Sequence, residues 1–175
     1  MSGDAGNLIG NQTAFVSPIT MNGKTSLNGS ETVFIGDLVF NQSVGGRNNM
    51  RGGGVTGGVV LNGPASFAVV NANTTSLNWK SIGTGANLLL IGCTGLAAAQ
   101  SFTSSAGGAI GLFNHFGGDA HLVMNDSLGT FTLDHTRFGS LSFDITDGTT
   151  GTFNLMECSF NHFDDPTLPK EIMHS

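Results

Sequence analysis

Five glycines recur at one constant interval, at Gly63, Gly85, Gly107, Gly129 and Gly151, and this spacing constrains the fold more than any other feature. The interval is about 22 residues, and a fixed period of about 20 to 50 residues is the signature of a repeat protein. With 27 glycines in 175 residues and only 10% charged residues, the chain has the composition of many short strands joined by tight turns. The sequence therefore predicts an all-β repeat fold.

The residues that follow these glycines repeat as well. The segment GTFTL at 129–133 recurs as GTFNL at 151–155, and a phenylalanine stands nine residues after each of the last three glycines, at Phe116, Phe138 and Phe160. Apolar residues alternate with polar ones within each repeat, as in half-buried strands, and glycine-rich turns separate the strands. The apolar column four residues after the glycine contains Phe67, Leu89, Leu133 and Leu155, and Gly111 interrupts it.

A unit of about 22 residues cannot bury its apolar side alone, so successive units are expected to stack and pair their strands. We predict a short parallel β-helix of about five coils over residues 63–165, right-handed because parallel crossovers usually are. The thirteen phenylalanines are expected to form stacked core rows.

Residues 1–62 lack the glycine period, since Asn41 occupies the position where the next glycine would stand. The pairs Asn22-Gly23 and Asn28-Gly29 favour hairpin turns, and the run 47–54, which contains RGGG, is interpreted as a flexible linker and not as a phosphate-binding loop. We therefore predict an extended N-terminal arm with short strands over residues 1–62 and a tail over 166–175.

Charge and patterning exclude several partners. Six basic against twelve acidic residues give a net charge of −6, which opposes binding to nucleic-acid phosphates and to anionic membranes. The first residues lack the basic and apolar regions of a signal peptide, and no apolar run is long enough to span a bilayer. The sequence predicts a protein made in the cytoplasm.

The two cysteines, Cys93 and Cys158, lie three repeats apart. Three coils separate them by about 14 Å, whereas a disulfide requires Cα atoms within about 7 Å. We expect free thiols. No cysteine or histidine spacing typical of a metal site occurs, so no metal, cofactor or catalytic residue is predicted.

Two arrangements of titratable residues are the candidates for chemistry. His135 and Glu157 share a phase on adjacent coils and are expected to stack, either as an acid and base pair or as a simple cross-strand hydrogen bond. Paired carboxylates could cleave a polysaccharide. Against this, sugar grooves favour Trp and Tyr, and the chain has one Trp, Trp79, and no Tyr. The candidate carboxylates are Asp144, Asp147, Asp164 and Asp165, and the other histidines, His115, His121, His162 and His174, fall at unrelated phases.

A Gly/Asn/Thr-rich N-terminal region followed by GTFxL coils, few charges and unpaired cysteines resembles virion proteins of tailed bacteriophages, which use short trimeric β-helices in capsid decoration (cement) proteins and in tail spikes and fibres. The resemblance covers residues 63–163 and is architectural, without a diagnostic motif. It implies a homotrimer and carries no catalytic residue onto this chain.

Between these roles the length of the chain favours a capsid decoration protein. The resemblance implies that residues 1–40 contact the major capsid protein, that the coils form a protruding knob on the capsid surface, and that the protein stabilises the virion without enzymatic activity. The alternatives are a receptor-binding tail spike or fibre component and, third, a β-helix enzyme that cleaves polysaccharide.

Overall fold

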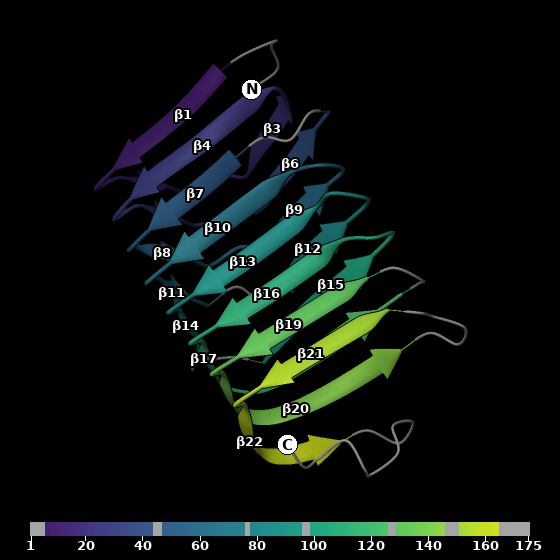
Figure 1. Ribbon diagram of the computed structural model, residues 1–175. Helices are drawn as coiled ribbons and strands as arrows, with labels where there is room; N and C mark the ends of the chain where they lie inside the picture. Colours follow the sequence, from purple (N-terminus) through teal and green to yellow (C-terminus); the bar gives the residue numbers. More distant parts are fainter. Residues whose placement is uncertain are drawn as a thin grey trace.

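The structure is a computed structural model that describes residues 6–43, 47–75, 78–95, 99–125, 129–145 and 151–164. These residues form an all-β solenoid of about seven turns, with parallel strands stacked coil upon coil (Figure 1). Each of the first six coils contributes one strand to each of three faces. The prediction of a parallel β-helix is confirmed, and its hand stays a prediction.

The first face is an eight-stranded parallel sheet that faces the viewer in Figure 1. Its strands are β1 (Gly6–Asn11), β4 (Thr25–Ser30), β7 (Arg47–Arg51), β10 (Ser66–Val70), β13 (Asn87–Ile91), β16 (Ala109–Phe113), β19 (Thr130–Asp134) and β21 (Thr152–Met156).

The second and third faces belong to one continuous sheet, because β20 (Arg137–Ile145) runs through the corner between them. The second face consists of two-residue strands: β2 (Ala14–Phe15), β5 (Val33–Phe34), β8 (Gly54–Val55), β11 (Asn73–Thr74), β14 (Thr94–Gly95) and β17 (Phe116–Gly117). The third face comprises β3 (Ile19–Gly23), β6 (Leu38–Gln42), β9 (Val59–Asn62), β12 (Asn78–Ile82), β15 (Gln100–Ser105) and β18 (Ala120–Met124), and β22 (Ser159–Asp164) pairs with β20.

The prediction of an extended N-terminal arm is wrong. Residues 6–62 form three coils that continue the same faces, with β1 paired to β4, β4 to β7 and β7 to β10. The glycine period does not reach them because two of these coils are shorter: the strand partners Gly6 and Thr25, like Arg47 and Ser66, are 19 residues apart in sequence. The run 47–54 is likewise no linker, since it supplies β7 and part of β8.

The glycine column does mark one structural position, the turn before each strand of the first face. Gly63, Gly85 and Gly107 have φ angles of 74°, 84° and 82°, in the left-handed region that glycine adopts without steric cost. Gly129 and Gly151 directly precede β19 and β21. The period is therefore a property of these turns.

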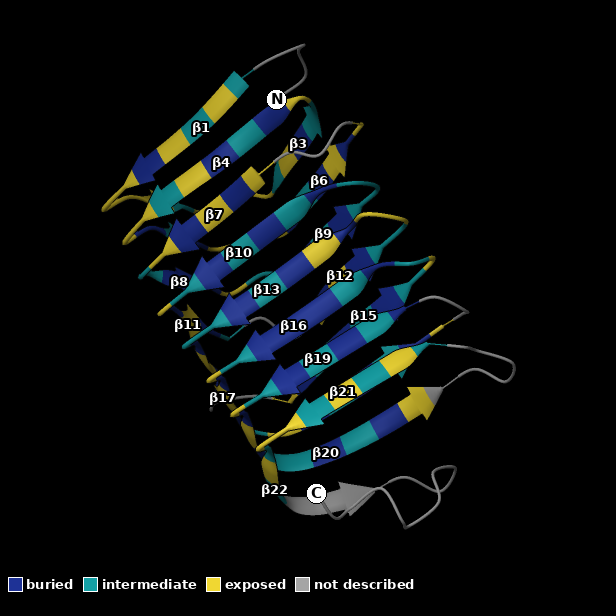
Figure 2. Cartoon of the chain, viewed as in Figure 1, coloured by how far each residue is buried: buried dark blue, intermediate teal, exposed yellow. Residues whose placement is uncertain are grey.

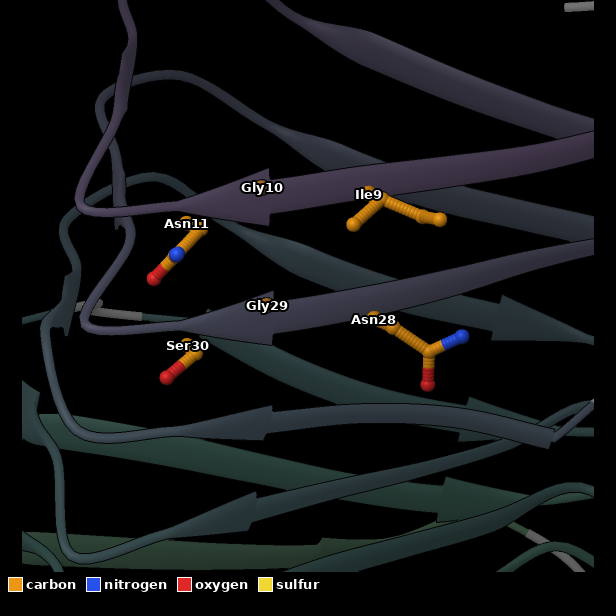
Figure 3. A pocket seen from close by; sticks show the side chains of 6 residues that line it. All are labelled: Ile9, Gly10, Asn11, Asn28, Gly29 and Ser30. Atoms are coloured by element: carbon orange, nitrogen blue, oxygen red, sulfur yellow. The ribbon is translucent and has the colours of Figure 1, made fainter.

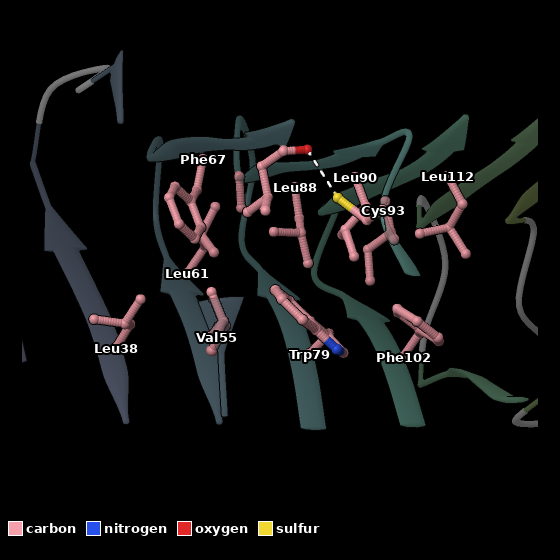
Figure 4. Close-up of a cluster of buried hydrophobic side chains, with 14 of the residues drawn as sticks. Leu38, Val55, Leu61, Phe67, Trp79, Leu88, Leu90, Cys93, Phe102 and Leu112 are labelled. Carbon is pink, nitrogen blue, oxygen red and sulfur yellow. Dashed lines mark hydrogen bonds between the residues drawn. The ribbon is translucent and has the colours of Figure 1, made fainter. Parts of the chain in front are cut away.

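The interior is filled by ladders of apolar side chains, one from each coil (Figure 4). Trp79 and Phe102 are fully buried and stack with ring centroids 6.4 Å apart, and Phe131 stacks on Phe153 at 5.4 Å. Stacked aromatic pairs of this kind confirm the predicted core in part, because Phe113 lies on the outer side of β16 and is not in the core. Phe116 departs from its predicted column: it pairs with Arg137 and not with Phe138, because this coil is shorter than the glycine period, and its side chain is 42% exposed.

Candidate functional site

One corner of the solenoid is built in the same way in every coil. The residue directly after each strand of the first face has a left-handed φ angle, between 48° and 70°, where L-amino acids other than Gly and Asn are uncommon. The corner column consists of Gln12, Glu31, Gly52, Asn71, Gly92, Asn114, His135 and Glu157. Because successive corners stack, their side chains meet, as in the hydrogen bond that Gln12 Nε2 donates to Glu31 Oε2 at 2.8 Å.

His135 and Glu157 form the most strongly charged part of this corner column. The Nε2 atom of His135 lies 2.8 Å from Glu157 Oε2, and its Nδ1 atom lies 2.5 Å from Asp134 Oδ1. The predicted stacking of His135 on Glu157 is therefore confirmed, whereas the sequence analysis missed Asp134. The hydrogen bond that His135 Nδ1 donates to the Asp134 carboxylate, together with the negative charges of Glu157 and Asp134, raises the pKa of His135 above its usual value of 6.5.

This cluster is an exposed ridge and has no neighbouring nucleophile in the described contacts. A protonated imidazole held between two carboxylates links two coils electrostatically, and solvent screens the interaction. Within the described part of the chain, no three His, Cys, Asp or Glu side chains are arranged to hold a metal ion. The arrangement supports a structural role for His135.

The candidate carboxylates do not form a described pair. Asp144 lies on β20 with an exposed side chain, in strand register with Val123. Asp164 ends β22, in register with Ser142, and Asp147 and Asp165 lie outside the described residues.

The histidines are placed at unrelated sites, as predicted. His121 makes a 2.8 Å hydrogen bond with Ser142 on the third face, and His162 lies on β22, in register with Ser140. His174 lies outside the described residues.

His115 is fully buried, and nothing in the repeat pattern indicated this. Its Nε2 atom lies 3.1 Å from Gln100 Oε1, and Gln100 Nε2 donates to the carbonyl oxygen of Thr74 at 3.1 Å. The ring lies between Phe102 and Phe138, and Nδ1 has no hydrogen-bond partner among the described residues. Burial lowers the pKa of His115 to about 4, so the imidazole is neutral at pH 7.

A second internal polar group lies nearer the N-terminus. The side chains of Gln42 and Asn48 are both buried and hydrogen bonded to each other, with Asn48 Nδ2 donating to Gln42 Oε1 at 3.0 Å. Asn48 Oδ1 also accepts from the backbone N–H of Leu27, and Asn48 Nδ2 donates to the carbonyl oxygen of Ser66. The Asn48 side chain thus joins three adjacent coils, and these hydrogen bonds satisfy the polar atoms of its buried amide.

Both thiols are free, as predicted. Cys93 and Cys158 point into the same interior column, and His115 and Thr136 lie between them, as the backbone bonds between successive corners show. Cys93 is buried and donates to the carbonyl oxygen of Val69 at 3.3 Å (Figure 4), and burial raises its pKa. Cys158 is partly exposed and accepts a 3.1 Å hydrogen bond from Thr136 Oγ1.

The first coil carries an open depression of about 340 Å³ between β1 and β4 (Figure 3). Ile9 and Asn28 line it, with the glycines and polar residues at the ends of the two strands. Ile9 is 72% exposed, and Val16, on the same coil, is 69% exposed. β1 pairs on one side only among the described residues, so this coil presents both an open strand edge and exposed apolar side chains.

The described residues contain no helix long and apolar enough to cross a membrane. Comparison with known proteins adds no relative: no family model, no curated protein and no solved structure matches this chain.

Proposed function

We propose that this protein is a non-enzymatic structural component of a virion, which decorates the outside of the capsid and binds the major capsid protein through its N-terminal coil. The single observation that carries the proposal is the first coil. It combines a strand edge that no other described strand pairs with and two of the exposed large apolar side chains of the described residues, Ile9 and Val16.

An open edge such as β1 has a free row of backbone N–H and C=O groups that pairs readily with another strand. The side chains of Leu8, Phe15 and Ile19 are packed against the core but only partly buried. A partner strand laid along β1 would complete the hydrogen bonding of this coil and cover these side chains. This is β-augmentation, in which main-chain bonds supply affinity and side-chain pockets supply specificity.

Hydrogen bonds between side chains of adjacent coils make the rest of the solenoid rigid. Asn22, Asn41 and Asn62 form a ladder along the third face, with Asn41 Nδ2 donating to Asn22 Oδ1 at 3.1 Å and Asn62 Nδ2 to Asn41 Oδ1 at 2.8 Å. Asn28 and Asn49 repeat this on the first face. Such ladders hold adjacent coils in register, which supports a role that depends on shape and stiffness.

The experiment is a binding assay with particles of the virus that encodes the chain, stripped of this protein and then incubated with purified variants. Ile9→Asp and Val16→Asp together should reduce recovery on capsids at least tenfold, because both place a charge on the proposed contact. The matched control is Met156→Asp at the opposite end, where Met156 is 48% exposed, and it should bind as the unaltered chain does. Thermal unfolding of each variant verifies that it is folded.

Quantification on intact particles separates this proposal from its alternatives. A decoration protein should be abundant on the capsid, and its removal should lower the temperature at which particles release their contents. A scarce protein at the tail would support the receptor-binding alternative. Polysaccharide cleavage that Asp144→Asn abolishes would establish the enzyme and overturn the structural role.

A further inference from the structure

The outer side of the first face carries an apolar patch in its middle. The outward-facing residues of the three central strands are Ser66, Ala68 and Val70 on β10, Asn87, Leu89 and Ile91 on β13, and Ala109, Gly111 and Phe113 on β16. Figure 2 shows the contrast along the sheet: β1, β4, β7 and β21 alternate with exposed residues, whereas only one residue of β10, β13 and β16 is exposed.

Gly111 makes this patch flat. A methyl group on its Cα would lie 2.6 Å from the ring of Phe113 and 2.8 Å from Leu89 Cδ2, so both side chains lie over the glycine. The outward apolar side chains therefore cover the sheet as a continuous layer. A flat apolar layer on a β-sheet packs well against another such layer, at about 10 Å between sheets.

Charged residues border the patch in an ordered way. One outward column runs from Arg51 on β7 through Val70, Ile91 and Phe113 to Asp134 on β19. Arg51 and Asp134 border the apolar part of this column and have opposite charge, and beyond them the column continues to Ser30 and Met156. Arg51 is exposed and makes no ion pair with any described residue. The column is thus complementary in charge to itself when its direction is reversed.

We propose that the first face is a two-fold symmetric interface between two copies of this chain, with their solenoid axes antiparallel and the two-fold axis lying along β13. In this arrangement Ile91 and Leu89 meet their own counterparts, and Val70 faces the other copy's Phe113. Arg51 of each copy faces Asp134 of the other, which gives two ion pairs for each dimer. The symmetry is isologous, in which the same patch serves both copies.

The neighbouring columns match under the same rotation. Ala68 faces Gly111, two small residues, and Asn87 faces its counterpart at the axis. Farther out, Asn49 faces Thr132 and Asn28 faces Asn154, so polar residues meet polar residues, whereas Ser30 faces the apolar Met156. A three-fold arrangement with parallel axes, which the bacteriophage resemblance implies, would place Arg51 near Arg51 and Asp134 near Asp134 if the first face lined the three-fold axis. The order of charges favours the two-fold arrangement.

The area is sufficient for a reversible dimer. Seven of the eight strands overlap, and at about 4.8 Å in width and 17 Å in length for each strand they cover roughly 1,100 Å² over both copies. This lies near the lower end for specific interfaces, where weak and transient associations are found, so we expect the dimer to dissociate on dilution. β1 has no counterpart among the described strands in this overlap, so the proposed dimer leaves the first coil available for capsid binding.

The test is sedimentation over a wide range of concentrations, where the unaltered chain should reach twice its mass of 18.0 kDa. Ile91→Asp, which places two carboxylates together at the axis, should weaken association at least a hundredfold. Val60→Asp, a partly exposed valine on the third face, is the matched control and should leave association unchanged.

The charge pair gives the sharper test. Arg51→Asp and Asp134→Arg should each weaken the dimer about tenfold or more, and the double variant should restore it to within a few fold. Within one chain these residues are four strands apart, roughly 19 Å, so rescue requires a contact between copies. A monomer at every concentration, a stable trimer, or failure of the double variant to restore a dimer lost in both single variants would each overturn the proposal.

Discussion

The imidazole of His135 forms an ion pair with Glu157 of the next coil, with Nε2 and Oε2 2.8 Å apart, and both residues occupy left-handed corners of the solenoid. The corner that strains the backbone of each residue is also what brings their side chains together. At the opposite end, Gln12 and Glu31 repeat the relationship. Contacts between stacked side chains thus stabilise corners whose left-handed φ angle glycine would adopt at a lower steric cost.

Because its pKa is raised by Asp134 and Glu157, His135 stabilises the fold most at pH values below 6.5, and this contribution is lost as pH rises through the raised pKa. We expect Glu157→Gln and Asp134→Asn each to lower the pKa of His135, measured by NMR titration of the ring protons. Glu31→Gln, at a distant corner, serves as the control. An unchanged His135 pKa in both variants would show that the carboxylates do not contact the ring in solution.

His115 should make the protein sensitive to acid. Its pKa of about 4 lies below the unfolded value of 6.5, so its stabilising effect is complete above pH 6.5 and lost as pH falls toward 4. The loss amounts to roughly 3 kcal/mol. Urea unfolding between pH 4 and 7 should show a smaller loss of stability in His115→Gln than in the unaltered chain. Equal pH dependence in the two proteins would mean that this imidazole is accessible to solvent.

Gly53 should be intolerant of any side chain. Its φ angle is +71°, and a methyl group on its Cα would lie within 2.0 Å of the carbonyl oxygen of Thr32 on the coil before it. Because that atom is backbone, the coils would have to separate, and we expect Gly53→Ala to reduce the free energy of unfolding by about 3 kcal/mol or more. Gly6→Ala, where the nearest atom is a methyl of Thr25 at 3.7 Å, should have almost no effect. Similar stabilities for both variants in urea would contradict the close stacking at this corner.

The two thiols should differ in reactivity. Cys158 is partly exposed, whereas Cys93 is buried with a raised pKa, and the thiolate is the reactive species. A disulfide reagent should modify one thiol per native chain quickly and the second only on unfolding. In Cys158→Ser the fast reaction should disappear. Rapid modification of Cys93 in that variant would indicate that the coil opens readily.

The strands from Gly63 onward could be predicted from the sequence. The number of residues between successive strands of the first face hardly varies there, so the turn glycines recur at a constant interval. Even there, a difference of one residue moved Phe116 out of its predicted column. The N-terminal coils were missed because the coil that joins β1 to β4 is too short for its columns to align with the glycine period. Their signal lay in asparagine, because Asn22, Asn41 and Asn62 align at spacings of 19 and 21.

The candidate site was predictable in part for the same reason. His135 and Glu157 are separated by one full glycine period, which placed them side by side, whereas Asp134 is adjacent in sequence and points to His135 only because the corner turns the backbone. The burial of His115 depends on its place directly after a left-handed corner, which a glycine column does not reveal. The charge complementarity of the first face could not be predicted from the sequence. It depends on which residues align across neighbouring strands, and only the strand register gives this alignment.

The stacking of coils of about 21 residues has a consequence for the chain as a whole: almost every strand contacts only the coils before and after it. The molecule behaves as a one-dimensional array, in which stability grows with the number of neighbouring pairs and assembly can begin at any coil and spread in both directions. Its cross-section is fixed by the three faces, but its length is not. One whole coil could be duplicated or deleted, with its ends placed at equivalent corners. The solenoid would become longer or shorter, and the remaining contacts between neighbouring coils would be of the same kind.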